Sequence, residues 1–280
     1  MVTYRRPQRI ALLLAMVLLG GGCGGAFVER VAGWYIARKI DGIFDLESEQ
    51  HDWVRDRVDH HLDSMRKGEL DRAIALLEDT RDLMAKGPSD AEIKAMQDRS
   101  DALMDRFVRR MAPDAAHLLA GLSDGQVDHF KGEMLDALED SYEDVRLSKQ
   151  ERRQRADEKF IERMEDILGK VRDDQRAEWL PIARRIADER PRQYASGKER
   201  INDVASKLRA HPPEAEIHAG MIDMWEKRYA AIGPKTREQR RAEQRAFLLR
   251  IDRSLDAEQR AHAVAEMDSR IAQLSRFRAR

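Results

Sequence analysis

The sequence predicts an all-α protein, an elongated bundle of about ten amphipathic helices, and three observations lead to this fold class. Aromatic residues make up only 6% of the 280 residues and Thr is scarce, so the chain is poor in residues that favour sheets. The abundant Ala, Leu, Arg, Glu and Met favour helices. Apolar residues recur at spacings of three and four from Phe27 onward, as in amphipathic helices.

Composition also excludes several classes of partner and site. Lys and Arg number 51 against 52 Asp and Glu, and a net charge of −1 gives no reason to expect nucleic acid as a partner. One Cys excludes a disulfide scaffold and a Cys-based zinc site within one chain. Gly20, Gly22 and Gly25 spell G-x-G-x-x-G, but a dinucleotide site needs a βαβ unit and no parallel sheet is predicted. We therefore expect no nucleotide and no cofactor.

Residues 1–22 look like a targeting segment rather than part of the fold. Three arginines precede an apolar stretch at 10–19 that is well short of the ~20 residues needed to span a bilayer as a helix. Small residues then lead to the only Cys, Cys23, which resembles a bacterial lipoprotein signal. The alternative is an uncleaved anchor with an incidental Cys.

The lipoprotein resemblance implies that residues 1–22 are removed and that Cys23 is acylated. The mature chain would then be held at a membrane and face the periplasm, because several acyl chains anchor a protein almost permanently. Gly24 follows Cys23 where an Asp would favour retention at the inner membrane, so the outer membrane is the expected location.

Helical stripes and their boundaries can be traced along the rest of the chain. Clear stripes lie at 70–84 and 103–111, and a four-three-four spacing that resembles a coiled-coil seam lies at 160–171. Gly and Pro are expected to separate the segments at Gly87-Pro88, Pro113, Gly121, Gly169, Pro191, Pro212-Pro213 and Gly233-Pro234. Capping boxes predict helix starts at Ser89…Glu92, Ser123…Gln126, Ser148…Glu151, Thr236…Gln239 and Asp256…Gln259.

The weakest seam between helical segments lies from Pro191 to Pro213. It divides the mature chain into an N-terminal bundle over 23–190 and a C-terminal segment over 191–280, which we expect to pack on the first because the linkers are short.

A short pattern of an apolar residue, three mostly polar residues and then Gln occurs four times. The copies are Leu46…Gln50, Leu122…Gln126, Val171…Gln175 and Leu255…Gln259. They resemble the L-T-x-x-Q element of Spy-type periplasmic chaperones, although none has Thr second. That resemblance implies a binding role for Gln50, Gln126 and Gln259. The alternative is that each copy is only a hydrophobic staple joined to a capping box, which any helix can use.

A wider resemblance covers most of the chain. The lipobox, the Trp34-Tyr35 pair, the segment 43–50 (IFDLESEQ) and the segment 112–116 (APDAA) ahead of Leu122 are similar to an uncharacterised family of bacterial lipoproteins. The resemblance implies location and fold and leaves the activity open. Trp34-Tyr35, just after the anchor, is suited to the membrane interface.

The helix after Gln50 carries the most suggestive ionisable residues. Asp52, Asp56, Asp59 and Asp63 share one face with His60, and such a set could hold a divalent ion. Interleaved arginines favour the alternative that this is a solvated, charge-paired face.

Three function classes remain. The first is a non-catalytic binding or chaperone-like lipoprotein, which is our prediction; the second is a structural or assembly lipoprotein with one envelope partner. An enzyme is the third, because no nucleophile–base pair, metal motif or phosphate loop can be named and no catalytic residue is predicted.

Overall fold

The computed structural model describes residues 25–228 and 235–278, which contain ten α-helices and no strand, so the all-α prediction is confirmed. Five helices form the first half of the chain: α2 (Gly25–Phe44), α3 (Ser48–Ser64), α4 (Leu70–Lys86), α5 (Asp90–Ala120) and α6 (Asp124–Ser141). A 3₁₀ turn, η2 (Glu143–Arg146), leads to the second half: α7 (Lys149–Leu168), α8 (Asp173–Leu208), α9 (Glu214–Glu226), α10 (Arg237–Ser254) and α11 (Ala257–Arg278).

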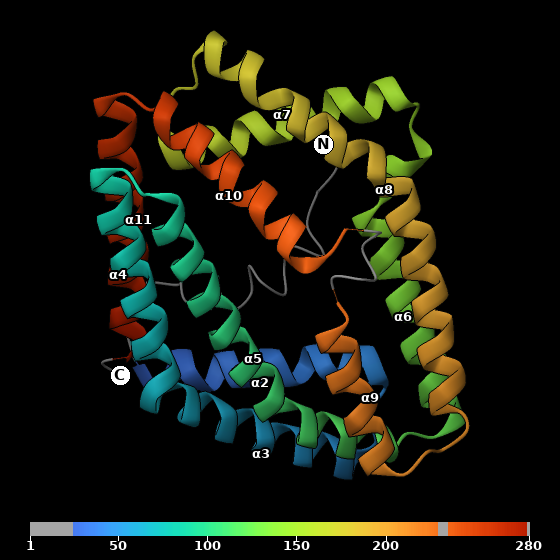
Figure 1. The fold of residues 1–280 in the computed structure, drawn as a ribbon. Helices are drawn as coiled ribbons and strands as arrows, with labels where there is room; N and C mark the ends of the chain where they lie inside the picture. The colour runs from blue at the N-terminus through green and yellow to red at the C-terminus, as the bar shows by residue number, and fades with distance from the viewer. Residues whose placement is uncertain (1–24, 229–234, 279–280) are drawn as a thin grey trace.

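The helices are paired around a four-sided outline and are not drawn out along one axis (Figure 1). In this view α2 and α3 lie along the bottom, α4 and α11 along the left, α7 with the first part of α8 along the top, and α6 with the rest of α8 along the right. Helix α5 runs across the inside, where it packs against α9 and α10.

The two halves repeat the same arrangement. Helix α2 packs on α3 and α6 in the first half, as α7 packs on α8 and α11 in the second. The two halves also pack on each other, since α4 packs on α11 and α8 packs on α6. Buried residues on α3 recur 125 positions later on α8, as the pairs Val54 and Trp179, Val58 and Ala183, and Leu62 and Ala187. We conclude that the fold contains an internal duplication.

The predicted helix starts are confirmed. The side chains of Ser89, Ser123, Ser148 and Thr236 each accept a hydrogen bond from the backbone three residues on, and the residue there caps back. Asp256 and Gln259 do the same, with Gln259 N donating to Asp256 Oδ1 at 2.9 Å. Leu122 and Val127 lie in one buried cluster, as a hydrophobic staple requires.

Both halves bend at the equivalent place, by different means. Between α3 and α4 the chain forms a short turn, η1 (Met65–Glu69), in which Gly68 leaves helical geometry and kinks the path of the two helices. The position equivalent to Arg66 in this turn, 125 residues later, is Pro191 of α8. Residues of α8 before Pro191 contact α7, through Asp188 for example, whereas Gly197 after it lies against Leu138 of α6.

Two of the predicted separators are wrong, since Pro113 lies inside α5 and Pro191 inside α8. Proline removes one backbone donor and bends a helix, but it does not end the helix when the freed carbonyl finds another donor. The boundary that we expected between 190 and 191 therefore falls within a continuous helix.

Arg152 supplies that donor at the bend of α8. The carbonyl of Ala187 lies four residues before Pro191 and would otherwise lack a helical partner. The buried guanidinium of Arg152 donates from Nε to this carbonyl at 3.1 Å and from Nη1 to Leu147 O at 2.9 Å. Arg152 thus stabilises the bend and fixes α7 against it.

We predict that Arg152→Ala lowers the free energy of unfolding by about 2–4 kcal/mol, because one buried and one partly buried carbonyl lose a charged donor. Arg153→Ala is the matched control: Arg153 pairs with Asp188 in a more exposed position and should cost clearly less. Denaturant titration followed by circular dichroism measures both. Adding Pro191→Ala to Arg152→Ala should recover part of the loss, since the new N–H can reach Ala187 O; no recovery would contradict this account.

Candidate functional site

The four apolar-x-x-x-Gln turns meet in two pairs, one in each of two opposite corners of the outline (Figure 1). The first pair joins the starts of α3 and α6 near the lower right. The second joins the starts of α8 and α11 near the upper left. Each turn is thus paired with a turn 76 or 84 residues away along the chain.

In the first pair, Gln50 and Gln126 bond to each other and to each other's turns. Gln126 Nε2 donates to Gln50 Oε1 at 2.6 Å and to Asp45 O at 3.0 Å. Gln50 Nε2 donates to Gly121 O at 3.0 Å. Each Oε1 also accepts from the backbone at the start of its own helix, Glu47 N and Ser123 N, both at 3.0 Å. Each glutamine therefore caps its own helix and holds the partner turn.

The second pair repeats this geometry. Gln175 and Gln259 exchange hydrogen bonds of 2.8 and 2.9 Å, Gln175 Nε2 donates to Ser254 O at 2.9 Å, and Gln259 Nε2 donates to Lys170 O at 2.8 Å. Arg172 adds bonds that the first pair lacks, because its guanidinium donates to Asp256, to Gln259 and to Ser254 O. Hydrogen bonds from the Gln259 backbone, and then Arg172, hold the pKa of Asp256 below its usual value.

The glutamines are held inside the protein. Gln175 is 0% exposed, Gln259 3% and Gln126 6%, and Gln50 is partly buried. Their polar atoms bond within the chain, so the geometry gives them a structural role, which is to close the two corners. The binding role predicted for Gln50, Gln126 and Gln259 stays a prediction, and any such role would act through the shape of the corners.

The predicted metal-binding face of α3 points to solvent. Asp52, Asp56, His60 and Asp63 are exposed, and Asp63 pairs with Arg66 at 2.7 Å. Within residues 25–228 and 235–278, no group of three or more His, Cys, Asp or Glu side chains is arranged to hold a metal ion. Metal binding stays a prediction, and a solvated, charge-paired face is the description that fits these side chains.

The neighbouring face of α3 holds a partly buried ionic group that was not predicted from the sequence. His61 Nε2 lies 2.6 Å from Asp114 Oδ2, and Arg57 Nε donates to the same oxygen at 3.0 Å. Burial raises the pKa of Asp114, but hydrogen bonds from Arg57 and His61 outweigh that effect and leave it below its usual value. The group ties α3 to α5. The sequence did indicate that His61 is buried, because it continues the apolar stripe of Val54 and Val58.

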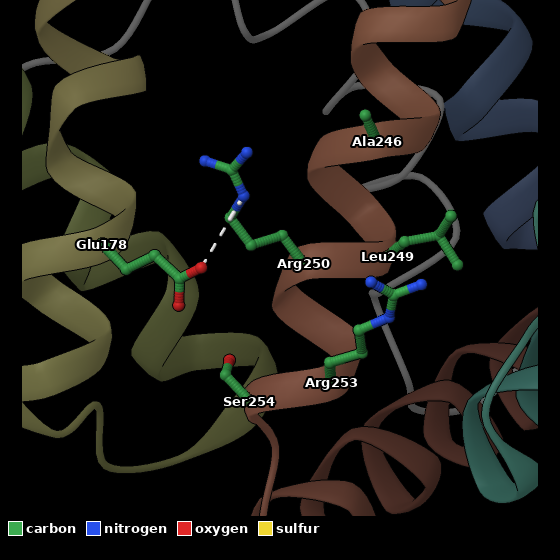
Figure 2. A pocket seen from close by; sticks show the side chains of 6 residues that line it. All are labelled: Glu178, Ala246, Leu249, Arg250, Arg253 and Ser254. Atoms are coloured by element: carbon green, nitrogen blue, oxygen red, sulfur yellow. Dashed lines mark ion pairs between the residues drawn. The ribbon is translucent and has the colours of Figure 1, made fainter.

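An open cleft of about 500 Å³ lies between the first turns of α8 and the last turns of α10 (Figure 2). Its walls carry two guanidinium groups, one carboxylate, a hydroxyl and two apolar side chains, those of Arg250, Arg253, Glu178, Ser254, Ala246 and Leu249. Arg250 reaches across to Glu178, with Nε 3.6 Å from Oε1. In the part of the chain that is described, the Arg253 side chain has no ion-pair or hydrogen-bond partner. This cleft was not predicted from the sequence.

Two observations concern the predicted N-terminal anchor. Cys23 and residues 1–22 lie outside the described residues. Among the helices that are described, none is both long enough and apolar enough to cross a membrane.

A family model, described as a family of unknown function (DUF6279), matches residues 42–230, about two thirds of the chain. The match confirms the predicted relation to an uncharacterised family. It includes Gln50, Gln126 and Gln175 but ends before α10 and Gln259, so the second corner is completed by residues beyond the matched segment. No curated protein and no solved structure matches the chain.

We predict that Gln175→Ala lowers the free energy of unfolding by about 2–4 kcal/mol, because it leaves buried partners without hydrogen bonds. Gln154→Ala removes an exposed glutamine from α7 and should change stability by less than about 0.5 kcal/mol. Thermal and denaturant unfolding measure both variants. The double variant Gln175→Ala with Gln259→Ala should cost clearly less than the two single losses together, since the glutamines bond to each other; additive losses would show that they are not coupled.

Proposed function

The chain belongs to the DUF6279 family, whose function is unknown, and we propose that it is a lipid-anchored, non-catalytic binding protein of the cell envelope. It holds other envelope proteins against its helices without nucleotide or nucleic acid. The anchor is acylated Cys23, and the protein faces the periplasm from the outer membrane.

One observation carries the binding proposal. Five large apolar side chains are between 40% and 53% exposed on a densely charged surface: Trp34, Met104, Ile186, Met224 and Leu248. Met104 belongs to α5, and Met224 and Leu248 belong to α9 and α10, which both pack on α5. Ile186 belongs to α8, which contacts α10. Apolar groups set among charges favour contact with other proteins, and flexible Met side chains suit varied partners.

The geometry near the anchor supports the location. Helix α2 begins at Gly25, so an acylated Cys23 would lie within about 7 Å of extended chain from its first residue. Trp34 is half exposed on this helix, with the Arg38 guanidinium 5.4 Å from its ring. An aromatic ring beside a cation suits the region of lipid headgroups.

For the anchor, we expect Cys23→Ser to move the protein from the membrane fraction to the soluble fraction, because the acyl chains would no longer be attached. Intact-mass measurement of the wild-type protein should show a chain that begins at an acylated Cys23. A mass that corresponds to the full N-terminus, or to an unmodified Cys23, would contradict the proposal.

For binding, the full chain in detergent should suppress aggregation of an unfolded envelope protein at equimolar ratio and without nucleotide. Replacing the four exposed apolar residues Met104, Ile186, Met224 and Leu248 by Ser should remove most of this effect. Replacing four exposed alanines on the same helices by Ser, at Ala102, Ala195, Ala219 and Ala242, is the matched control and should leave it unchanged.

Two outcomes would contradict the binding proposal. Absence of suppression, together with one stoichiometric partner in crosslinked envelopes, would indicate a structural or assembly lipoprotein. Turnover of a cell-wall fragment that persists through repurification would indicate an enzyme.

A further inference from the structure

The cleft between α8 and α10 lies where the residues of the second half differ from their equivalents in the first half. Glu178 lies three residues after Gln175, as Trp53 lies three residues after Gln50. Arg250 lies nine residues before Gln259, as His117 lies nine before Gln126. In the first half, the rings of Trp53 and His117 lie 4.8 Å apart at this place, and α9 packs on the same helix as His117. In the second half Glu178 and Arg250 stand there instead, beside an open volume of about 500 Å³.

The open place has the charges of a recognition site for a monoanion. Two guanidinium groups and one carboxylate give its walls a charge of +1. Arg253 has no side-chain partner among the described residues, and Arg250 has only the 3.6 Å contact with Glu178. Guanidinium groups bind carboxylates and phosphates with paired N–H donors. Glu178 would repel a second negative charge, so the walls favour a carboxylate over a phosphate dianion.

The other residues of the cleft indicate which groups a ligand should carry next to its carboxylate. Glu178 and the Ser254 hydroxyl offer acceptor oxygens, since Ser254 Oγ donates its own proton to Ile251 O at 2.7 Å. These acceptors require an N–H donor next to the carboxylate. Leu249 and Ala246 offer apolar surface, enough for one side chain but too little for a long hydrocarbon chain. An apolar residue at the C-terminal end of a polypeptide combines a carboxylate, an amide N–H and one apolar side chain.

We infer that this cleft binds the C-terminal carboxylate of a partner polypeptide that ends in an apolar residue. Arg253 and Arg250 take the carboxylate, Glu178 accepts from the amide N–H, and Leu249 and Ala246 contact the last side chain. The inference rests on the proposed binding of envelope proteins and names one chemical feature of such a partner. The arginines come from α10, beyond the residues that the family model matches, so the site need not be common to the family.

The test is a calorimetric titration of the full chain in detergent with N-acetyl-glycyl-glycyl-leucine. The free acid should bind, and its C-terminal amide should bind more weakly by roughly tenfold or more, because the charged hydrogen bonds are lost. Arg253→Gln should weaken binding of the acid by roughly tenfold or more. Glu178→Trp, which places the residue of the first half into the second, should abolish binding by filling the cleft.

The matched control is Arg163→Gln, which removes an exposed arginine of α7 and should bind the acid as the wild type does. Circular dichroism should show that each variant is folded. If Glu178→Trp does not fold, Arg253→Gln still tests the inference. The inference is overturned if acid and amide bind alike, if octanoate or inorganic phosphate binds more tightly than the peptide, or if no peptide binds at millimolar concentration.

Failure of the inference and failure of the proposed function give different results. If the wild type suppresses aggregation but binds no peptide acid, the cleft is not a carboxylate site and the proposed function stands. If the peptide acid binds as expected but aggregation is not suppressed, the carboxylate site is supported and the proposed binding of unfolded clients is contradicted.

Discussion

The reciprocal pairing of glutamine side chains is the constraint on which the rest of the fold depends. A primary amide has two donors and an acceptor oxygen, so one glutamine can cap its own helix, bond the opposite glutamine and bond the opposite turn. Gln50 with Gln126, and Gln175 with Gln259, use this capacity fully. Because each pair joins turns far apart in sequence, the two pairs fix two corners, and the helices between them must close into the four-sided outline.

Different residues produce the equivalent bend in the two halves of the fold. The bend after α3 is made in η1, where Gly68 leaves helical geometry, whereas the bend in α8 is made at Pro191, with Arg152 bonded to the carbonyl that the proline leaves free. The paired turns differ far less between halves than the bends do. A reciprocal glutamine pair needs one geometry, but a helix can bend wherever its freed carbonyl finds a donor.

The duplication also explains where the molecule is free to vary. Some equivalent positions hold buried apolar residues in both halves, as Val54 and Trp179 do, whereas buried Val127 of α6 corresponds to the partly buried Arg260 of α11. Positions at the rim of a corner are at least partly exposed, so burial constrains them less. There the first half has Trp53 against His117, and the second has Glu178 facing Arg250 across an open cleft. The corners are therefore rigid supports, and their rims are where a recognition site can arise.

The sequence by itself determined the helical fold, the helix starts and the four glutamine turns, because these follow from residue spacing and from bonds that span three or four positions. It could not show that Gln50 meets Gln126 or that Gln175 meets Gln259, since a local pattern carries no information about which distant turn completes its hydrogen bonds. The continuity of α8 through Pro191 also depended on the tertiary structure. Arg152 lies 35 residues from Ala187, so only folding brings the donor that keeps α8 intact to the carbonyl that needs it.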